Sequence, residues 1–234
     1  MLDKFKEIIF GMSEKKDGPM NLLNDNNGQT IINRRHFFAK QGIDDQKVVS
    51  AVFANALEVV IVKSGDEGKI ISGAAALVTS KKNLFLTITV ADCAQIYIYD
   101  PIQKVIGLVH ADWRGIVGNI SAKTINTLKN SFKSKPQDLQ VFVGPHIRSC
   151  HFEVQEDVAI MFKQYTKYII RREEKIYIDL ASIIRSQLLT VGVLGDNISF
   201  SKECTYCEDK KYFSWRRDKP QEVEVVVAFM GLIG

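Results

Sequence analysis

The sequence predicts a single α/β domain. Short apolar runs rich in Val, Ile and Phe recur along the chain and are typical of buried β-strands. Segments with apolar residues three and four positions apart alternate with them and are typical of helices. The 234 residues are 46% hydrophobic and 25% charged, which is ordinary for a globular protein with one sizeable core. We therefore expect one domain over residues 1–234 that mixes strands and helices.

The elements follow in order from these patterns. Residues 2–10 alternate apolar and charged side chains and predict an edge strand or a short helix, and residues 12–27, rich in Gly, Pro and Asn, predict a loop. Helices are expected over residues 29–41, 116–132, 154–165 and 180–191, with Gly42 and Gly192 as stops for the first and the last. Strands are expected over residues 48–53, 57–62, 84–90, 96–99, 105–109, 139–143, 176–179, 198–200 and 223–233.

The stretch from residue 86 to residue 115 holds the most informative side chains. Cys93 lies between the apolar runs 84–90 and 96–99, and His110, seventeen positions after Cys93, directly follows the next run, 105–109. Two strands joined by a turn bring such ends together. A thiol and an imidazole meeting at strand ends are typical of a metal site or of a nucleophile with its base.

Charge and cysteine content exclude several classes of protein. The net charge of +4 comes from 31 basic and 27 acidic residues, and the basic pairs are dispersed, so we expect no nucleic-acid partner. No apolar run approaches the roughly eighteen residues of a membrane span, and the first residues do not resemble a signal peptide. Four cysteines are too few for a secreted disulfide scaffold. We expect a cytoplasmic monomer or homodimer.

Two further cysteine and histidine clusters occur later in the chain. His146 and His151 flank Cys150, and this segment predicts the lip of a site. The spacing Cys204-x-x-Cys207 suggests zinc, but a structural zinc site needs four ligands and usually a second such pair. No second pair is present in the sequence, so we do not expect a zinc site there.

Several motifs, in order, resemble one family. These are TVADCAQIYIYDP, GLVHADWRG, VGPHIRSCHFEV, YIDLASIIRSQLLTVGV and ECTYCEDKKYFSWRRD. They resemble the YfiH family, also called the laccase-domain or polyphenol-oxidase family, over about residues 20–218. The resemblance implies a four-layer α/β/β/α sandwich with a mixed sheet, a broad fold shared with the catalytic domain of cytotoxic necrotizing factor.

The resemblance also implies a zinc site of one Cys and two His. Cys93 and His110 match two of these ligands, and the third position is occupied by Asn55. An amide oxygen is a weak donor beside a thiolate and an imidazole, so we expect zinc to be bound weakly or not at all. Copper is the less expected metal, because the chain lacks the paired His-x-His motifs of a multicopper cluster.

The activity that the resemblance implies is purine nucleoside phosphorolysis or adenosine deamination. The substrates would be adenosine, inosine, guanosine or methylthioadenosine, together with phosphate. Cys93, His110 and Asp92 are the expected catalytic residues, with Asp92 orienting a ligand. The expected substrate and phosphate contacts are Asn55, Arg114, Gly115, His146 and Arg216. At Gly115, backbone N–H groups at a helix start suit an anion, although this glycine would equally permit close packing of helix and strand.

Three other functions stay open. The first is a copper-dependent polyphenol oxidase. The second is a hydrolase that edits peptidoglycan precursors, with Cys93 as nucleophile and His110 as base. The third is a non-catalytic binding paralogue, which the replacement of a metal ligand by Asn55 would produce.

Overall fold

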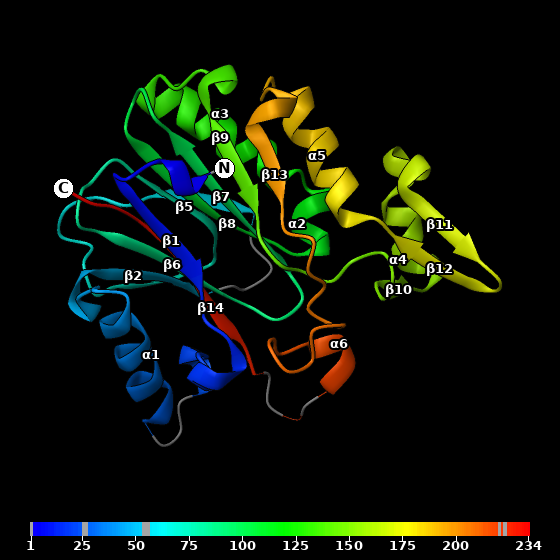
Figure 1. Ribbon diagram of the computed structural model, residues 1–234. Helices are drawn as coiled ribbons and strands as arrows, with labels where there is room; N and C mark the ends of the chain where they lie inside the picture. The colour runs from blue at the N-terminus through cyan, green and yellow to red at the C-terminus, as the bar shows by residue number, and fades with distance from the viewer. Residues whose placement is uncertain (1, 25–27, 53–56, 220, 222–223) are drawn as a thin grey trace.

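Two β-sheets packed face to face form the centre of the fold, and helices cover both outer faces (Figure 1). The computed structural model describes residues 2–24, 28–52, 57–219, 221 and 224–234. The expected α/β/β/α arrangement is confirmed by the order of its hydrophobic layers.

The first sheet has five strands in the order β1-β14-β6-β2-β4. Strand β2 pairs in parallel with β6 and β4, whereas β14 pairs antiparallel with β1 and β6, so the sheet is mixed. Its strands are β1 (Ile8–Met12), β2 (Val48–Val52), β4 (Ile70–Ser72), β6 (Phe85–Val90) and β14 (Val226–Leu232).

The second sheet has six strands in the order β13-β9-β7-β8-β5-β3. Its central strands are antiparallel, and the outer pairs β13–β9 and β3–β5 are parallel. Its strands are β3 (Glu58–Ile61), β5 (Ala74–Thr79), β7 (Ala94–Asp100), β8 (Val105–Ala111), β9 (Gln140–Val143) and β13 (Ile198–Phe200).

Alternation along the strands separates the hydrophobic layers. On β8, Ile106 and Leu108 face the core between the two sheets, while Val105 and Val109 face the helices. On β6, Leu86 belongs to the core between the sheets. Side chains on a strand point alternately to the two faces, so strands buried on both faces read as nearly continuous apolar runs.

The helices cover the outer faces according to their apolar stripes. Helix α1 (Gln29–Lys40) lies on the five-stranded sheet, where Phe37 and Phe38 make edge contacts with Phe229 of β14. Helices α2 (Trp113–Val117), α3 (Ile120–Phe132) and α5 (Leu180–Thr190) cover the six-stranded sheet. Figure 1 shows α1 and the α3–α5 pair on opposite sides of the sheets.

A smaller lobe extends beside the sandwich (Figure 1). It contains a three-stranded antiparallel sheet in the order β10-β12-β11, formed by β10 (Glu153–Val154), β11 (Ile169–Arg172) and β12 (Lys175–Ile178). Helix α4 (Glu156–Met161) lies next to it, and α6 (Trp215–Asp218) follows much later in the chain. Short 3-10 helices occupy Leu2–Lys4, Lys15–Asp17, Leu22–Asn24, Asp45–Lys47, Pro136–Asp138, Lys163–Tyr168 and Gly195–Asn197.

Two expected helices differ from the structure. The helix expected over residues 116–132 is two helices, because Asp112 caps α2 and the left-handed backbone of Asn119 (φ 59°) separates α2 from α3. A Cβ atom at Gly118 would lie 2.6 Å from Leu57 Cδ1. The glycine at this break therefore lets the Leu57 side chain pack closely against the backbone. The helix expected over residues 154–165 begins only at Glu156 and ends at Met161.

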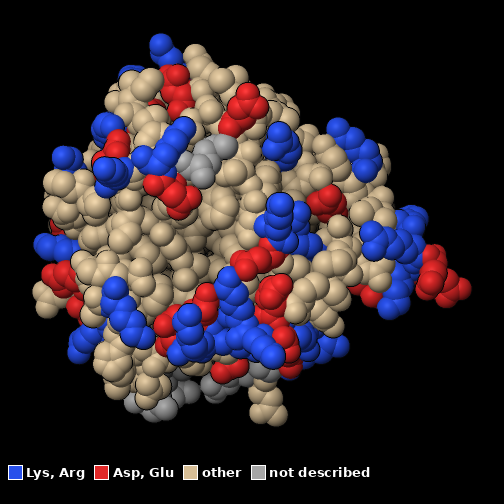
Figure 2. Space-filling model, viewed as in Figure 1, with Lys and Arg blue, Asp and Glu red and all other residues tan. Residues whose placement is uncertain are grey.

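The surface is consistent with the balanced composition. In Figure 2, basic and acidic side chains are interspersed over the face shown, with no broad stripe of one sign. Within the part of the chain that the structure describes, no helix is both long enough and apolar enough to span a bilayer.

Candidate active site

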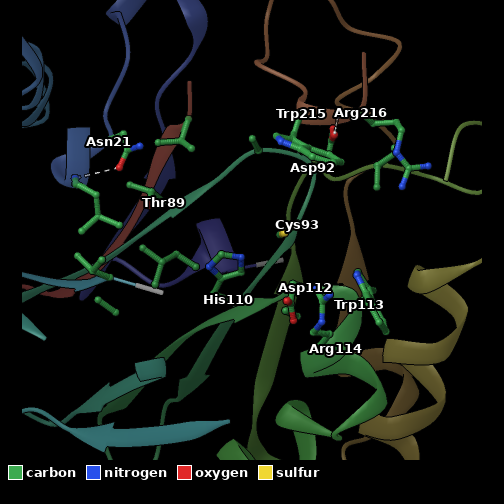
Figure 3. Close-up of a pocket in the computed structure, with 18 of the residues that line it drawn as sticks. Asn21, Thr89, Asp92, Cys93, His110, Asp112, Trp113, Arg114, Trp215 and Arg216 are labelled. Carbon is green, nitrogen blue, oxygen red and sulfur yellow. Dashed lines mark hydrogen bonds between the residues drawn. The ribbon is translucent and has the colours of Figure 1, made fainter. Parts of the chain in front are cut away.

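A cavity of about 780 Å³ lies where β6 ends, β7 begins and β8 ends (Figure 3). Strand β2, helix α1 and the start of α6 contribute to its walls. Its polar wall includes Arg34, Thr87, Cys93, His110, Asp112 and Arg216. The size and the mixed apolar and polar walls are typical of a small-molecule site.

The strand pairing of β7 and β8 brings Cys93 and His110 to this cavity. Ala94 pairs with Ala111 and Gln95 with His110, so Cys93, directly before β7, lies at the same end of the hairpin. Both residues line the cavity, and in Figure 3 the His110 ring projects into it with Cys93 nearby. The thiol and the imidazole therefore line one cavity from adjacent strand ends, and their catalytic role stays a prediction.

Burial governs the protonation of both groups. It raises the pKa of the Cys93 thiol well above its usual range, and the nearby Asp112 and Asp92 raise it further. Burial also lowers the pKa of His110 to about 4. In this state the thiol carries its proton and the imidazole is neutral. A neutral imidazole can accept a proton or bind a metal.

Asp92 connects the cavity to the C-terminal part of the chain. It is 8% exposed and has a left-handed backbone (φ 75°), which Asp tolerates better than most residues. Its Oδ1 accepts a hydrogen bond from Thr205 Oγ1 (2.6 Å). Its Oδ2 accepts from Ser214 Oγ (2.9 Å) and from the backbone N–H of Arg216 (2.8 Å). Both oxygens are thus occupied, and Asp92 positions the segment that carries Arg216.

The expected anion seat at Gly115 is wrong. The N–H of Gly115 donates to Asp112 Oδ1 (2.5 Å), which caps the five-residue helix α2. Gly115 is buried and is not among the described residues that line the cavity. A Cβ atom there would lie 3.0 Å from Asp112 Oδ1, so the glycine permits close packing instead.

Arg114 and Arg216 both line the cavity, and their role as substrate or phosphate contacts stays a prediction. The exposed Arg114 guanidinium lies over the Trp113 ring, 4.2 Å from its centroid. Arg216 lies over Phe152 at 5.2 Å, and its guanidinium donates to the backbone carbonyl of Glu153.

His146 lies elsewhere, and Asn55 is outside the described residues. The His146 ring is fully buried, its Nδ1 is 2.8 Å from the Gly144 carbonyl oxygen, and burial lowers its pKa to about 4. It is not among the described residues that line the cavity, so the expected substrate contact is wrong.

Arg34 was not among the site residues expected from the sequence. This residue of α1 is only 6% exposed and lines the cavity. Its guanidinium donates to Ser50 Oγ (2.8 Å), Thr87 Oγ1 (3.2 Å) and the Met20 carbonyl oxygen (3.3 Å). These are three neutral acceptors for five N–H groups, and no carboxylate of the described chain is within ion-pair distance. Burial lowers its pKa to about 10, so it stays cationic.

A signal for Arg34 was present in the sequence. Phe37 and Phe38 follow it by three and four positions, which places Arg34 on the apolar face of the helix. An arginine on such a face is buried and needs partners.

Asp112 was also missed as a site residue. It lines the cavity at 7% exposure, and burial raises the pKa of its carboxyl. It is the second acidic side chain on the cavity wall, after Asp92.

The donors of the implied zinc site fit zinc in part. A thiol sulfur and a neutral imidazole line one cavity, and both are zinc ligands. A catalytic zinc usually has three protein ligands, and Cys93 and His110 are two candidates. Asn55, which the resemblance puts at the third position, is outside the described residues, so weak zinc binding stays a prediction.

The expectation that Cys204-x-x-Cys207 has no partner pair is wrong. Cys150 and His151 lie beside it, and the ligand atoms of all four residues lie within 4.8 Å of one another. Fifty-four residues separate Cys150 from Cys204, so only the folded chain brings the two pairs together.

Sequence comparisons find a family model and several named relatives that match the chain. A family model described as multi-copper polyphenol oxidoreductase laccase matches residues 6–230. A Staphylococcus saprophyticus protein named purine nucleoside phosphorylase is 31% identical, over 96% of this chain and 92% of its own length. A Bacteroides thetaiotaomicron protein of the same name is 33% identical over 64% of this chain, and the match spans only 57% of that protein.

Solved structures show the same fold. The crystal structure of the Bacillus licheniformis hypothetical protein YfiH superposes with a TM-score of 0.93 at 25% identity, covering 99% of this chain and 95% of that one.

Proposed function

The chain belongs to the multi-copper polyphenol oxidoreductase laccase family, and from this premise we propose that it is a purine nucleoside phosphorylase. In this reaction a phosphate oxygen forms a bond to C1′ of the ribose while the bond from C1′ to N9 of the purine breaks. The electron pair of that bond leaves with the base, which takes up a proton. The products are the free purine and ribose 1-phosphate, or 5-methylthioribose 1-phosphate when the substrate is methylthioadenosine.

One observation carries the proposal. A single cavity is lined by a thiol, a neutral imidazole, a buried guanidinium and a buried carboxyl, from Cys93, His110, Arg34 and Asp112. Its volume of about 780 Å³ leaves room for a nucleoside and a phosphate together. Adenosine, inosine, guanosine and methylthioadenosine are the candidate substrates.

Arg34 is our candidate for the phosphate contact. A buried cation is stable only when an opposite charge or several hydrogen bonds compensate it. The described neighbours of Arg34 give it neutral acceptors only. A phosphate in the cavity would supply the missing negative charge, and the planar guanidinium suits bidentate binding of phosphate oxygens. Arg114 and Arg216 line the same cavity and are additional candidates.

Asp112 is our candidate for the proton that the leaving base needs. Burial raises the pKa of its carboxyl, and a carboxyl with a raised pKa holds a proton closer to neutral pH. Cys93 and His110 would hold a zinc ion, which supplies Lewis-acid stabilisation of negative charge when bound.

The proposal is tested by incubating the protein with each nucleoside, with and without phosphate, and separating products by chromatography. Phosphate-dependent release of a free purine is the expected result. Conversion of adenosine to inosine without phosphate would instead identify a deaminase at this site. Absence of any product with all four nucleosides, from folded protein supplied with zinc, would overturn the proposal and leave a binding protein.

A further inference from the structure

Four potential metal ligands gather in two loops away from Cys93 and His110. Cys150 and His151 precede β10, and Cys204 and Cys207 follow β13. The sulfur of Cys150 is 3.6 Å from that of Cys204 and 3.8 Å from that of Cys207. The Nδ1 atom of His151 is 3.2 Å from the Cys150 sulfur and 3.3 Å from the Cys207 sulfur.

These distances are close to those of a tetrahedral zinc site. With Zn–S bonds of about 2.3 Å and Zn–N bonds of about 2.0 Å, tetrahedral angles place two sulfurs about 3.8 Å apart and a sulfur and a nitrogen about 3.5 Å apart. A disulfide would need its sulfurs at about 2.05 Å. All four cysteines of the chain are free thiols. The cluster therefore has the spacing of ligands around one ion.

Contacts that involve no metal hold these donors in place. The backbone N–H of Arg148 donates to the Cys204 sulfur (3.4 Å), and the Arg148 guanidinium donates to the Ser201 carbonyl oxygen (2.7 Å). The His151 ring stacks on Tyr206, with centroids 3.9 Å apart and planes at 12°. An N–H bond to a ligand sulfur and a fixed imidazole are the supporting contacts that metal sites usually have.

We propose that Cys150, His151, Cys204 and Cys207 bind one structural Zn²⁺ ion in a closed, four-coordinate site. Three thiolates and one imidazole are a standard ligand set for structural zinc, and they leave no position open for a substrate. Thiolate ligands favour zinc over the hard cations Mg²⁺ and Ca²⁺. Binding releases the thiol protons to solvent and involves no redox step.

The ion would fix one wall of the cavity. Cys204 and Cys207 begin the segment that continues to α6, and Thr205, Ser214 and Arg216 of this segment donate to Asp92. Trp215 and Arg216 line the cavity. The zinc would thus attach the segment to the loop at Cys150 from one side, while Asp92 holds it from the other.

The test compares two variants in which the cavity thiol is already removed. Cys93→Ser and Cys93→Ser/Cys207→Ser are purified from zinc-supplemented cells without chelator, and the zinc of each is measured by elemental analysis. About one zinc per chain is expected in the single variant, and its loss in the double variant. Cys93→Ser/Cys207→His is expected to recover the zinc, because imidazole is also a ligand. Cys207 is exposed, which favours folding of these variants.

A second measurement does not depend on any variant at Cys207. X-ray absorption at the zinc edge of Cys93→Ser should show mainly sulfur neighbours with one nitrogen. Mainly oxygen and nitrogen neighbours would overturn the proposal. Equal zinc in the single and double variants would do the same, as would absence of zinc from Cys93→Ser. A disulfide among residues 150, 204 and 207 in freshly purified protein, found by non-reducing peptide mapping, would assign the cluster to redox chemistry instead.

Discussion

The part of the chain that the structure describes contains two groups of cysteine and histidine side chains, and they differ in kind. Cys93 and His110 lie at the ends of paired strands and line a large cavity. Cys150, His151, Cys204 and Cys207 lie in two loops, with their donor atoms gathered within 4.8 Å. The first group offers two metal-ligand atoms on the wall of a cavity. The second offers four ligand atoms that are close enough together to bind one ion.

This difference suggests a catalytic role for the first group and a structural role for the second. A reacting site needs room and an unfilled coordination position, whereas a structural metal site needs a complete ligand set. Cysteine and histidine can therefore serve either a catalytic or a structural role. Their position, at strand ends beside a cavity or in two adjoining loops, indicates which.

Replacing the cysteines one at a time should separate the two sites most clearly. We expect Cys93→Ala to reduce phosphate-dependent purine release at least about 100-fold, because it removes a group that contacts the reacting substrate or its metal. We expect Cys207→Ala to lower the melting temperature more than Cys93→Ala does, because it removes a ligand of the structural zinc. Product chromatography and circular dichroism measure both effects. The opposite pattern would exchange the two roles.

Replacing Arg34 should weaken phosphate binding. We expect Arg34→Met to raise the KM for phosphate about tenfold or more, because a hydrogen bond to a charged group is worth about 1.5 to 3 kcal/mol. Arg35→Met is the matched control, since Arg35 is exposed and pairs with Asp45 on the surface, where an ion pair contributes at most about 1 kcal/mol. Initial rates at varied phosphate measure the effect. A rise confined to the KM for the nucleoside would argue against Arg34 as the phosphate contact.

Replacing Asp92 should loosen the wall that carries Arg216. We expect Asp92→Asn to lower the free energy of unfolding by about 2 to 3 kcal/mol, because Thr205 Oγ1, Ser214 Oγ and the Arg216 N–H lose a charged acceptor. Asparagine tolerates the left-handed backbone, so the turn itself should persist. Urea denaturation measures the change.

Asp100→Asn is the control for this change at the other end of β7. Asp100 is also buried, and its Oδ1 accepts from the N–H groups of Ile102 and Gln103, far from the cavity. The Asp100→Asn substitution should destabilise the fold without changing the rate of purine release. Asp92→Asn should also slow purine release, because it loosens the cavity wall that carries Arg216. An equal loss of rate in Asp100→Asn would mean that lower stability alone accounts for the slower release.

Acid should destabilise the protein through two buried imidazoles. Burial lowers the pKa of both His110 and His146 to about 4 in the folded state, whereas an unfolded histidine titrates near pH 6.5. Below pH 6.5 the unfolded chain binds more protons, so stability is complete above that pH and falls as the pH falls toward 4. Each ring should remove roughly 1.4 kcal/mol per pH unit within this window.

Urea denaturation at several pH values measures this slope. His146→Gln should keep the contribution of His110 and lose that of His146, so its stability should depend less steeply on pH. An unchanged slope in this variant would show that the His146 ring does not titrate on unfolding.

Much of the fold could be predicted from the sequence, because the patterns that indicate strands and helices involve residues that are close together along the chain. Apolar runs predicted the central strands β6, β7 and β8, and the periodicity around Phe37 and Phe38 predicted α1. Cys93 and His110 could be paired from sequence because the turn at Asp100 and Pro101 joins their strands directly. Strand β11 was missed, since Ile169–Arg172 is short and half charged.

Contacts between side chains of distant segments could not be predicted in this way. Arg34 meets Ser50 and Thr87, and the second of these is 53 residues away. Whether the Gly115 N–H was available for an anion depended on the Asp112 side chain, which takes it as a helix cap. The partner of Cys204-x-x-Cys207 was a Cys-His pair more than fifty residues earlier.

The order of amino acids was therefore enough to predict the family, the layered α/β architecture and the thiol and imidazole of the cavity. These depend on motifs and on strand ends that are neighbours along the chain. The folded chain was needed to see where Arg34 lies, why residue 115 is a glycine and which residues complete the second cysteine cluster. Those contacts arise where separate loops and sheets pack against each other, and no local pattern records which distant segments will meet.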